Sequence, residues 1–243
     1  MLGQCLVIGA AASGSFRLPV LLVFLAAYSA FIGLEGFKRL RRRFQTGEAT
    51  SLWDLPHASR WFLLGAAVGG LLAVFGFRLH VLLFWGLLSL LLVALHTVML
   101  FRRQERSVSA EWLGILGITL AAGVAWSAGT GRMGREAFVL WGICFLYFAG
   151  SVPYVKLRVQ QMRKTSVSAW SALLYAIVAL ALVAAGVYVG AYRWLMAIPF
   201  ALLLAKIVWV TARGKAPRTL ARVGYAEVAY STLFMVIAIV AFN

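Results

Sequence analysis

Long, uninterrupted apolar runs are the feature that most limits what this chain can fold into. Nine of them follow one another, and most approach the roughly 20 residues that a helix needs to cross the hydrocarbon core of a bilayer. They are continuous rather than alternating in short segments, which disfavours the strands of a transmembrane barrel. The sequence predicts an all-α, polytopic transmembrane helical bundle of about nine helices, forming a single transmembrane domain over residues 1–243. The nine runs are Leu2–Phe16, Leu18–Phe37, Trp61–Phe77, His80–Phe101, Glu111–Ser127, Glu136–Val155, Ala169–Val189, Ala191–Thr211 and Val223–Phe242.

Composition excludes the two other broad classes. Of the residues, 63% are hydrophobic and only 12% are charged, whereas a soluble domain carries about 25% charged residues. A chain this apolar also cannot stay solvated as a disordered protein. Its two cysteines, Cys5 and Cys144, lie in separate apolar runs without metal-ligand spacing. We expect them to be buried thiols that act as small hydrophobes.

The first apolar run is the weakest. It offers 15 residues before Arg17, and no basic residue precedes Arg17. A secretory signal peptide would begin with a basic region, so a short or partial first helix is the favoured interpretation. A chain start placed too late would account for that shortness.

Basic residues outnumber acidic ones by 23 to 7, which gives a net charge of +16. Such an excess can indicate nucleic-acid binding, but here the position of the charges gives another explanation. Eighteen of the basic residues lie in or beside alternate connections, namely Lys38, Arg39, Arg41, Arg42, Arg43, Arg60, Arg102, Arg103, Arg106, Lys156, Arg158, Arg163, Lys164, Lys206, Arg213, Lys215, Arg218 and Arg222. The other five are Arg17, Arg78, Arg132, Arg135 and Arg193.

Cytoplasmic loops are the basic ones, so the larger group is predicted to face the cytoplasm. This places the chain in a bacterial plasma membrane, with its N-terminus inside and its C-terminus outside when nine helices span. The expected partners are the bilayer, anionic lipids at the basic cytoplasmic face and an unidentified small or lipid ligand. Nucleic acid is not expected as a partner.

Polar and ionisable groups inside apolar helices are the first candidates for function, because a charge at the bilayer centre costs roughly 2.5–3.5 kcal/mol on the insertion scale. These groups gather in the cytoplasmic halves of the predicted helices. Structural alternatives remain open: Glu35 can pair with neighbouring basic residues, His96 can be a hydrogen-bonded bundle residue, and Lys206 can extend its ammonium to the interface. The predicted ligand-binding residues are Glu35, His96, Ser151, Tyr154, Lys206, Glu227 and Tyr230.

Two segments carry most of this prediction. In the first, Pro153 lacks a backbone N–H, so a helix that continues through it leaves the Ala149 carbonyl without a partner and bends. In the second, Tyr230 and Ser231 follow Glu227 by three and four residues, which places all three on one helix face. The two segments together are expected to line a polar pocket open to the cytoplasm. Hydrogen bonding between helices without any ligand is the simpler alternative.

Three stretches resemble a known family, namely residues 145–158 (FLYFAGSVPYVKLR), 222–227 (RVGYAE) and 106–114 (RSVSAEWLG). On these stretches the chain resembles the YwiC-like family of bacterial membrane proteins. The resemblance extends from about Phe16 to the end of the chain. The Pro-Arg-Glu-His-Gly-Ala-Trp-like run with which the family begins has no counterpart in residues 1–5 (MLGQC). The family implies a class of protein rather than an activity.

The layout is also similar to that of UbiA-type prenyltransferases, which hold Mg²⁺ and a prenyl diphosphate on two Asp-rich motifs. This chain has a single aspartate, Asp54, and no two acidic residues four apart. We therefore predict no Mg²⁺-dependent prenyl transfer, no metal site, no cofactor and no catalytic residues. The favoured function is binding or transport of an amphipathic or anionic ligand. A membrane enzyme acting on a lipid or isoprenoid without that chemistry, and an accessory subunit, remain the alternatives.

Overall fold

In a computed structural model of the protein, residues 1–45, 56–102, 107–163, 169–214 and 219–242 are described, except for the side chains of 34–45 and 220. All regular structure in these ranges is helical, which confirms the predicted fold class. The α-helices are α1 (Leu2–Ala12), α2 (Leu18–Gln45), α3 (His57–Leu71), α4 (Val81–Phe101), α5 (Val108–Thr130), α6 (Arg135–Ala149), α7 (Ser151–Met162), α8 (Trp170–Tyr188), α9 (Ala197–Arg213) and α10 (Leu220–Phe242).

Seven helical segments are long and apolar enough to cross a membrane, counted over the described residues. Two of them include a short irregular turn. A π-helical turn, Leu72–Gly76, continues α3, and a 3₁₀ turn, Trp194–Met196, leads into α9. The helix α1 and the described apolar part of α2, Leu18–Gly33, are shorter. The chain is thus a multi-pass membrane protein whose first helix is short, as the sequence predicts.

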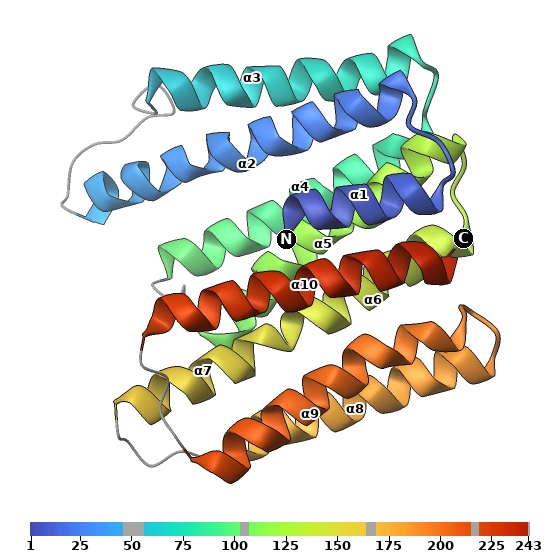
Figure 1. Ribbon diagram of the computed structural model, residues 1–243. Coiled ribbons are helices and arrows are strands. Elements are labelled where there is room, and N and C mark those ends of the chain that lie inside the picture. The colour runs from blue at the N-terminus through green and yellow to red at the C-terminus, as the bar shows by residue number, and fades with distance from the viewer. Residues whose placement is uncertain (46–55, 103–106, 164–168, 215–218, 243) are drawn as a thin grey trace.

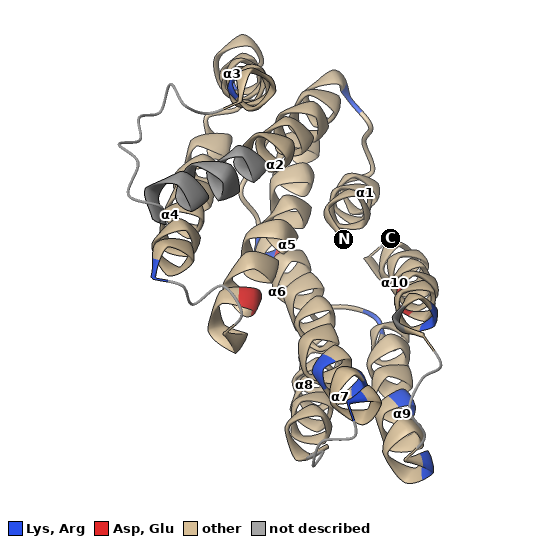
Figure 2. Cartoon of the chain, turned by 90° about the vertical axis from the view of Figure 1, so that its left-hand side faces the viewer, with Lys and Arg blue, Asp and Glu red and all other residues tan. Residues whose placement is uncertain are grey.

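The helices run back and forth between two ends of one elongated bundle (Figure 1). At one end α2, α4, α7 and α9 finish and α3, α5, α8 and α10 begin. We call this the basic end, because the connections there carry the larger group of basic residues. Figure 2 looks onto this end and shows basic residues on α7 and α9 near the viewer. The turns at the opposite end hold the smaller group, so the two groups separate as predicted.

The centre of the bundle is formed by α5 and the α6–α7 segment. In each of these two spans, 44% of the most apolar 18-residue stretch is buried, whereas the share is 17–33% in the other five spans. The hairpins α2–α3 and α8–α9 lie on either side of this centre (Figure 1). Local signals set the limits of α5: the Ser107 hydroxyl accepts a hydrogen bond from the Ala110 N–H at 3.1 Å, and Gly131 (φ 72°) ends the helix in the left-handed conformation.

The helix predicted over Glu136–Val155 is interrupted and continues further than expected, to Met162. The interruption falls at Gly150, between α6 and α7, three residues before Pro153. The missing N–H of Pro153 is the physical reason, since the helix loses one backbone hydrogen bond there. The break makes α7 a separate helical segment at the basic end, and the predicted bend stays a prediction.

The short helix α1 is held against α5 by a close backbone approach. An added Cβ at Gly9 would overlap the carbonyl oxygen of Ala122 and lie 2.9 Å from the Ala125 Cβ. Cys5, Leu6, Ile8 and Ala10 on the same helix are fully buried. A helix of 11 residues is too short to span, and its stability therefore depends on this packing.

We expect Gly9→Ala to destabilise the protein by about 1–3 kcal/mol, because the added methyl group overpacks a rigid backbone contact. Thermal unfolding in detergent measures the loss. Gly117→Ala on α5 is the matched control, since an added Cβ there meets nothing within 4 Å. The control should be neutral or gain up to about 1 kcal/mol of helix propensity; equal losses in the two variants would contradict the close α1–α5 contact.

Candidate functional site

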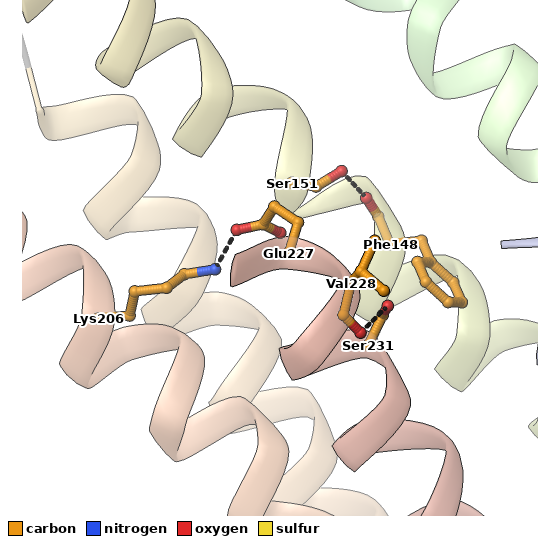
Figure 3. Close-up of polar contacts among 6 residues, drawn as sticks. All are labelled: Phe148, Ser151, Lys206, Glu227, Val228 and Ser231. Atoms are coloured by element: carbon orange, nitrogen blue, oxygen red, sulfur yellow. Dashed lines mark hydrogen bonds and ion pairs between the residues drawn. The ribbon is translucent and has the colours of Figure 1, made fainter. Parts of the chain in front are cut away.

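A buried cation between α7, α9 and α10 forms the centre of the candidate site. The Lys206 ammonium lies 2.6 Å from the Glu227 Oε1 and only 8% of the lysine side chain is exposed. The ring centroids of Tyr154 and Tyr230 lie 4.0 and 4.8 Å from the same ammonium. We call these four residues the Lys206 cluster; Figure 3 shows its ion pair. A carboxylate and two ring faces therefore surround the charge.

The position of Lys206 decides between two sequence interpretations. It lies seven residues before the end of α9 at Arg213, which is about 10 Å along the helix axis from the basic end. A lysine that snorkels would turn its ammonium toward that end and expose it. The short contact to Glu227 and the low exposure show instead that Lys206 is held inside the bundle. The snorkelling alternative is wrong for this residue.

A layer of aromatic rings closes the bundle directly beyond the cluster, on the side of the opposite end. Tyr147 and Phe234 stack with centroids 4.0 Å apart and an interplanar angle of 4°. The Phe200 centroid lies 5.8 Å from that of Tyr147, and Phe148 also packs on Phe234. Phe200 lies six residues before Lys206 on α9, and Phe234 lies seven residues after Glu227 on α10. Tyr147 and Phe148, on α6, precede Tyr154 of α7 by seven and six residues. The cluster is thus separated from the opposite end by densely packed, largely apolar side chains.

The other predicted site residues lie in different parts of the structure. Ser151 lies on α7 beside the cluster, but its hydroxyl donates to the Phe148 carbonyl at 2.6 Å, within its own chain segment (Figure 3). His96 lies on α4 against Gly114 of α5, on the far side of the bundle from α9 and α10 (Figure 2). Its Nδ1 is buried and has no hydrogen-bond partner among the described residues. The side chain of Glu35 lies outside the described residues, and so its predicted role stays a prediction.

Two polar contacts near the site were not anticipated from the sequence. Gln4 on α1 donates a hydrogen bond to the Ser231 hydroxyl of α10 at 3.0 Å, and Ser231 donates to the Val228 carbonyl. At the basic end, Lys156 pairs with Glu111 at 2.8 Å, with both side chains about one-third exposed. Gln4 and Ser231 are both polar residues within apolar runs, and that signal was present in the sequence. Nothing in the sequence showed that α1 and α10 are neighbours.

The two cysteines are buried, as predicted, and they are also close together. The thiols of Cys5 on α1 and Cys144 on α6 interact directly in the core, although 139 positions separate them in the chain. Among the described residues, no three histidine, cysteine or acidic side chains gather in a way that could hold a metal ion. The chemistry that the Lys206 cluster offers is therefore ionic: a cation shielded by two rings and neutralised by one carboxylate.

Comparison with known protein families gives a match to the first half of the chain. The family model described as YwiC-like protein matches residues 1–126, just over half of the chain. The matched part covers α1 to most of α5, whereas the Lys206 cluster lies beyond it, on α7, α9 and α10. No curated protein and no solved structure matches the chain.

The ion pair makes a double-mutant cycle informative. We expect Lys206→Met and Glu227→Gln each to lower the free energy of unfolding by about 2–3 kcal/mol, because either change leaves an unpaired charge in the bundle. The expected loss is smaller than the roughly 3–5 kcal/mol for removing one partner of a fully buried ion pair, since 25% of the Glu227 side chain is exposed. The double variant should be more stable than the sum of the single losses predicts. Additive losses, measured by unfolding in detergent, would contradict direct coupling of the two groups.

Proposed function

This chain belongs to the YwiC-like family of membrane proteins, and we propose that it binds or transports an amphipathic anion at the Lys206 cluster. The proposal rests on one observation above all: a lysine ammonium, 8% exposed, lies 2.6 Å from a glutamate within the spanning helices. Ionisable groups in such positions are rare and usually mark a substrate or ion pathway. We take the ion pair to be the ligand-free state of the site.

The ligand is an anion because the cluster already holds its own cation. The faces of the Tyr154 and Tyr230 rings favour a positive charge at Lys206 whether or not Glu227 is in place. A ligand carboxylate or phosphate can replace the Glu227 carboxylate at the ammonium, because it offers the same acceptor oxygens. A neutral ligand would leave Lys206 unpaired inside the membrane, which is costly. Selectivity for anions follows from that difference.

The surroundings favour a ligand that has an apolar part and enters from the basic end. Arg213 and Arg222 at that end attract anions, while the aromatic layer closes the way beyond the cluster. On α10, Val228 directly follows Glu227 and is 62% exposed. In a membrane this exposed apolar side chain faces lipid, so an alkyl chain can lie against it. We place the basic end in the cytoplasm because 18 of the 23 basic residues belong to it.

Octyl phosphate is a suitable probe of this proposal. We expect it to raise the thermal stability of the detergent-solubilised protein in a concentration-dependent way, since a ligand that binds the folded state stabilises it. Glu227→Gln should bind the probe about tenfold more tightly, because the competing carboxylate is gone. Lys206→Met should lose the effect, and Tyr154→Phe should keep most of it, because its ring face remains.

Two comparisons control for detergent-like effects of the probe. Octyl glucoside and octyltrimethylammonium carry the same chain without the anion and should not stabilise the wild-type protein specifically. An equal response of Lys206→Met and wild type to octyl phosphate would contradict binding of the anion at the Lys206 cluster. A weaker response in Glu227→Gln than in wild type would overturn the idea that Glu227 and the anion compete.

The orientation is tested separately with single cysteines in a Cys5→Ala, Cys144→Ala background. A cysteine at Met133, in the turn between α5 and α6, should react with a membrane-impermeant maleimide in intact cells. A cysteine at Arg213, at the end of α9, should react only after the cells are permeabilised. The reverse pattern would place the basic end outside and contradict the proposal.

A further inference from the structure

An open groove lies between α4, α5 and α6, on the side of the bundle away from α9 and α10. Its volume is about 490 Å³, within the roughly 300–1,000 Å³ common for ligand sites. Leu95, Leu113, Leu116 and Phe145 give it a largely apolar lining. None of the four residues of the Lys206 cluster lines it, so the groove is a separate feature from the site of the proposed function.

The side chains that line the groove change from polar to apolar with increasing distance from the basic end. At the basic end its rim is formed by Arg102, directly after α4, and by Ser109, in the first turn of α5. Val98 and Leu95 lie four and seven residues before Arg102, about 6 and 10 Å deeper along α4. On the antiparallel helix α5, Trp112 and then Leu116 follow at increasing depth. The groove thus passes from a cation and a hydroxyl, through an indole, to aliphatic side chains.

Trp112 lies at the intermediate depth of the groove. Its ring packs on that of Tyr175, with centroids 5.7 Å apart, so its position is fixed by the bundle. Its indole Nε1 is buried, so the part of Trp112 that lines the groove is its ring rather than its N–H. Tryptophan is typical of the depth at which lipid headgroups meet the hydrocarbon.

The groove opens sideways rather than into the interior of the bundle. Leu95 and Val98 on its wall are 46% and 49% exposed. In a membrane-spanning chain this exposed apolar surface faces the acyl chains of the bilayer. A lipid can therefore enter from the membrane, with its charged end held near the surface where Arg102 lies.

We infer that this groove binds one anionic phospholipid from the leaflet at the basic end. The phosphate pairs with the Arg102 guanidinium and accepts a hydrogen bond from the Ser109 hydroxyl. The ester region, which lies just below the phosphate in a phospholipid, packs against the Trp112 ring. One acyl chain lies along Leu95, Leu116 and Phe145. The order of polarity along the groove is the order of chemical groups along such a lipid, and the charge of Arg102 selects an anionic headgroup.

Native mass spectrometry of the full chain, released from nanodiscs that contain equal amounts of phosphatidylglycerol and phosphatidylcholine, tests this inference. Wild-type protein should retain one phosphatidylglycerol in preference to phosphatidylcholine. Arg102→Gln should reduce that retention about fivefold, as expected for one basic residue at a membrane surface. Trp112→Leu keeps an apolar side chain but removes the indole surface, and should reduce retention about threefold.

Arg213→Gln is the matched control, because it removes the same charge at the same end but away from the groove. It should leave retention unchanged. The inference is overturned if Arg102→Gln and Arg213→Gln lower retention equally, or if phosphatidylcholine is retained as well as phosphatidylglycerol. It is also overturned if the protein carries no lipid and instead forms a dimer that is weakened by Arg102→Gln, since a second copy would then fill the groove. Unchanged melting temperatures show that the variants are folded.

Discussion

The arrangement of the helices at the basic end depends on the need to neutralise Lys206. A lysine about 10 Å inside a membrane helix cannot keep its water shell, and its charge must be balanced by protein groups. Glu227 supplies the balancing charge at 2.6 Å, and the rings of Tyr154 and Tyr230 supply two electron-rich faces. These groups come from three helices. Satisfying one ammonium therefore fixes α7, α9 and α10 relative to each other near the basic end.

The elements of the fold were predictable because the bilayer imposes a simple length requirement on apolar runs. The break near Pro153 followed from the missing N–H. Within the site, the spacing of Glu227 and Tyr230 on one helix face indicated that they act together. Each of these predictions depends on local chemistry, which the sequence contains directly.

Contacts between helices were not predictable, because in a membrane both faces of a helix are apolar. On α4, Leu90 is 67% exposed and Leu92 is 6% exposed, yet nothing in the sequence distinguishes the two leucines. In a soluble helix the exposed position would be polar and would reveal which face packs inward. The pairing of Lys206 with Glu227, the contact of Gln4 with Ser231 and the meeting of Cys5 with Cys144 all depend on this missing information. For the same reason His96 was grouped with residues on the far side of the bundle.

The break at Gly150 has a mechanical consequence for the two layers that it separates. Tyr147, in the aromatic layer, precedes the break, and Tyr154, in the Lys206 cluster, follows it. The backbone loses one hydrogen bond between them, yet Gly150 keeps right-handed helical dihedrals (φ −66°, ψ −21°). An added Cβ at Gly150 would lie 2.9 Å from a Leu203 side-chain atom and 3.0 Å from a Tyr175 ring atom. Any larger residue would push α8 or α9 aside, so close packing at Gly150, and not the helix backbone alone, holds the charged cluster in register with the stacked rings.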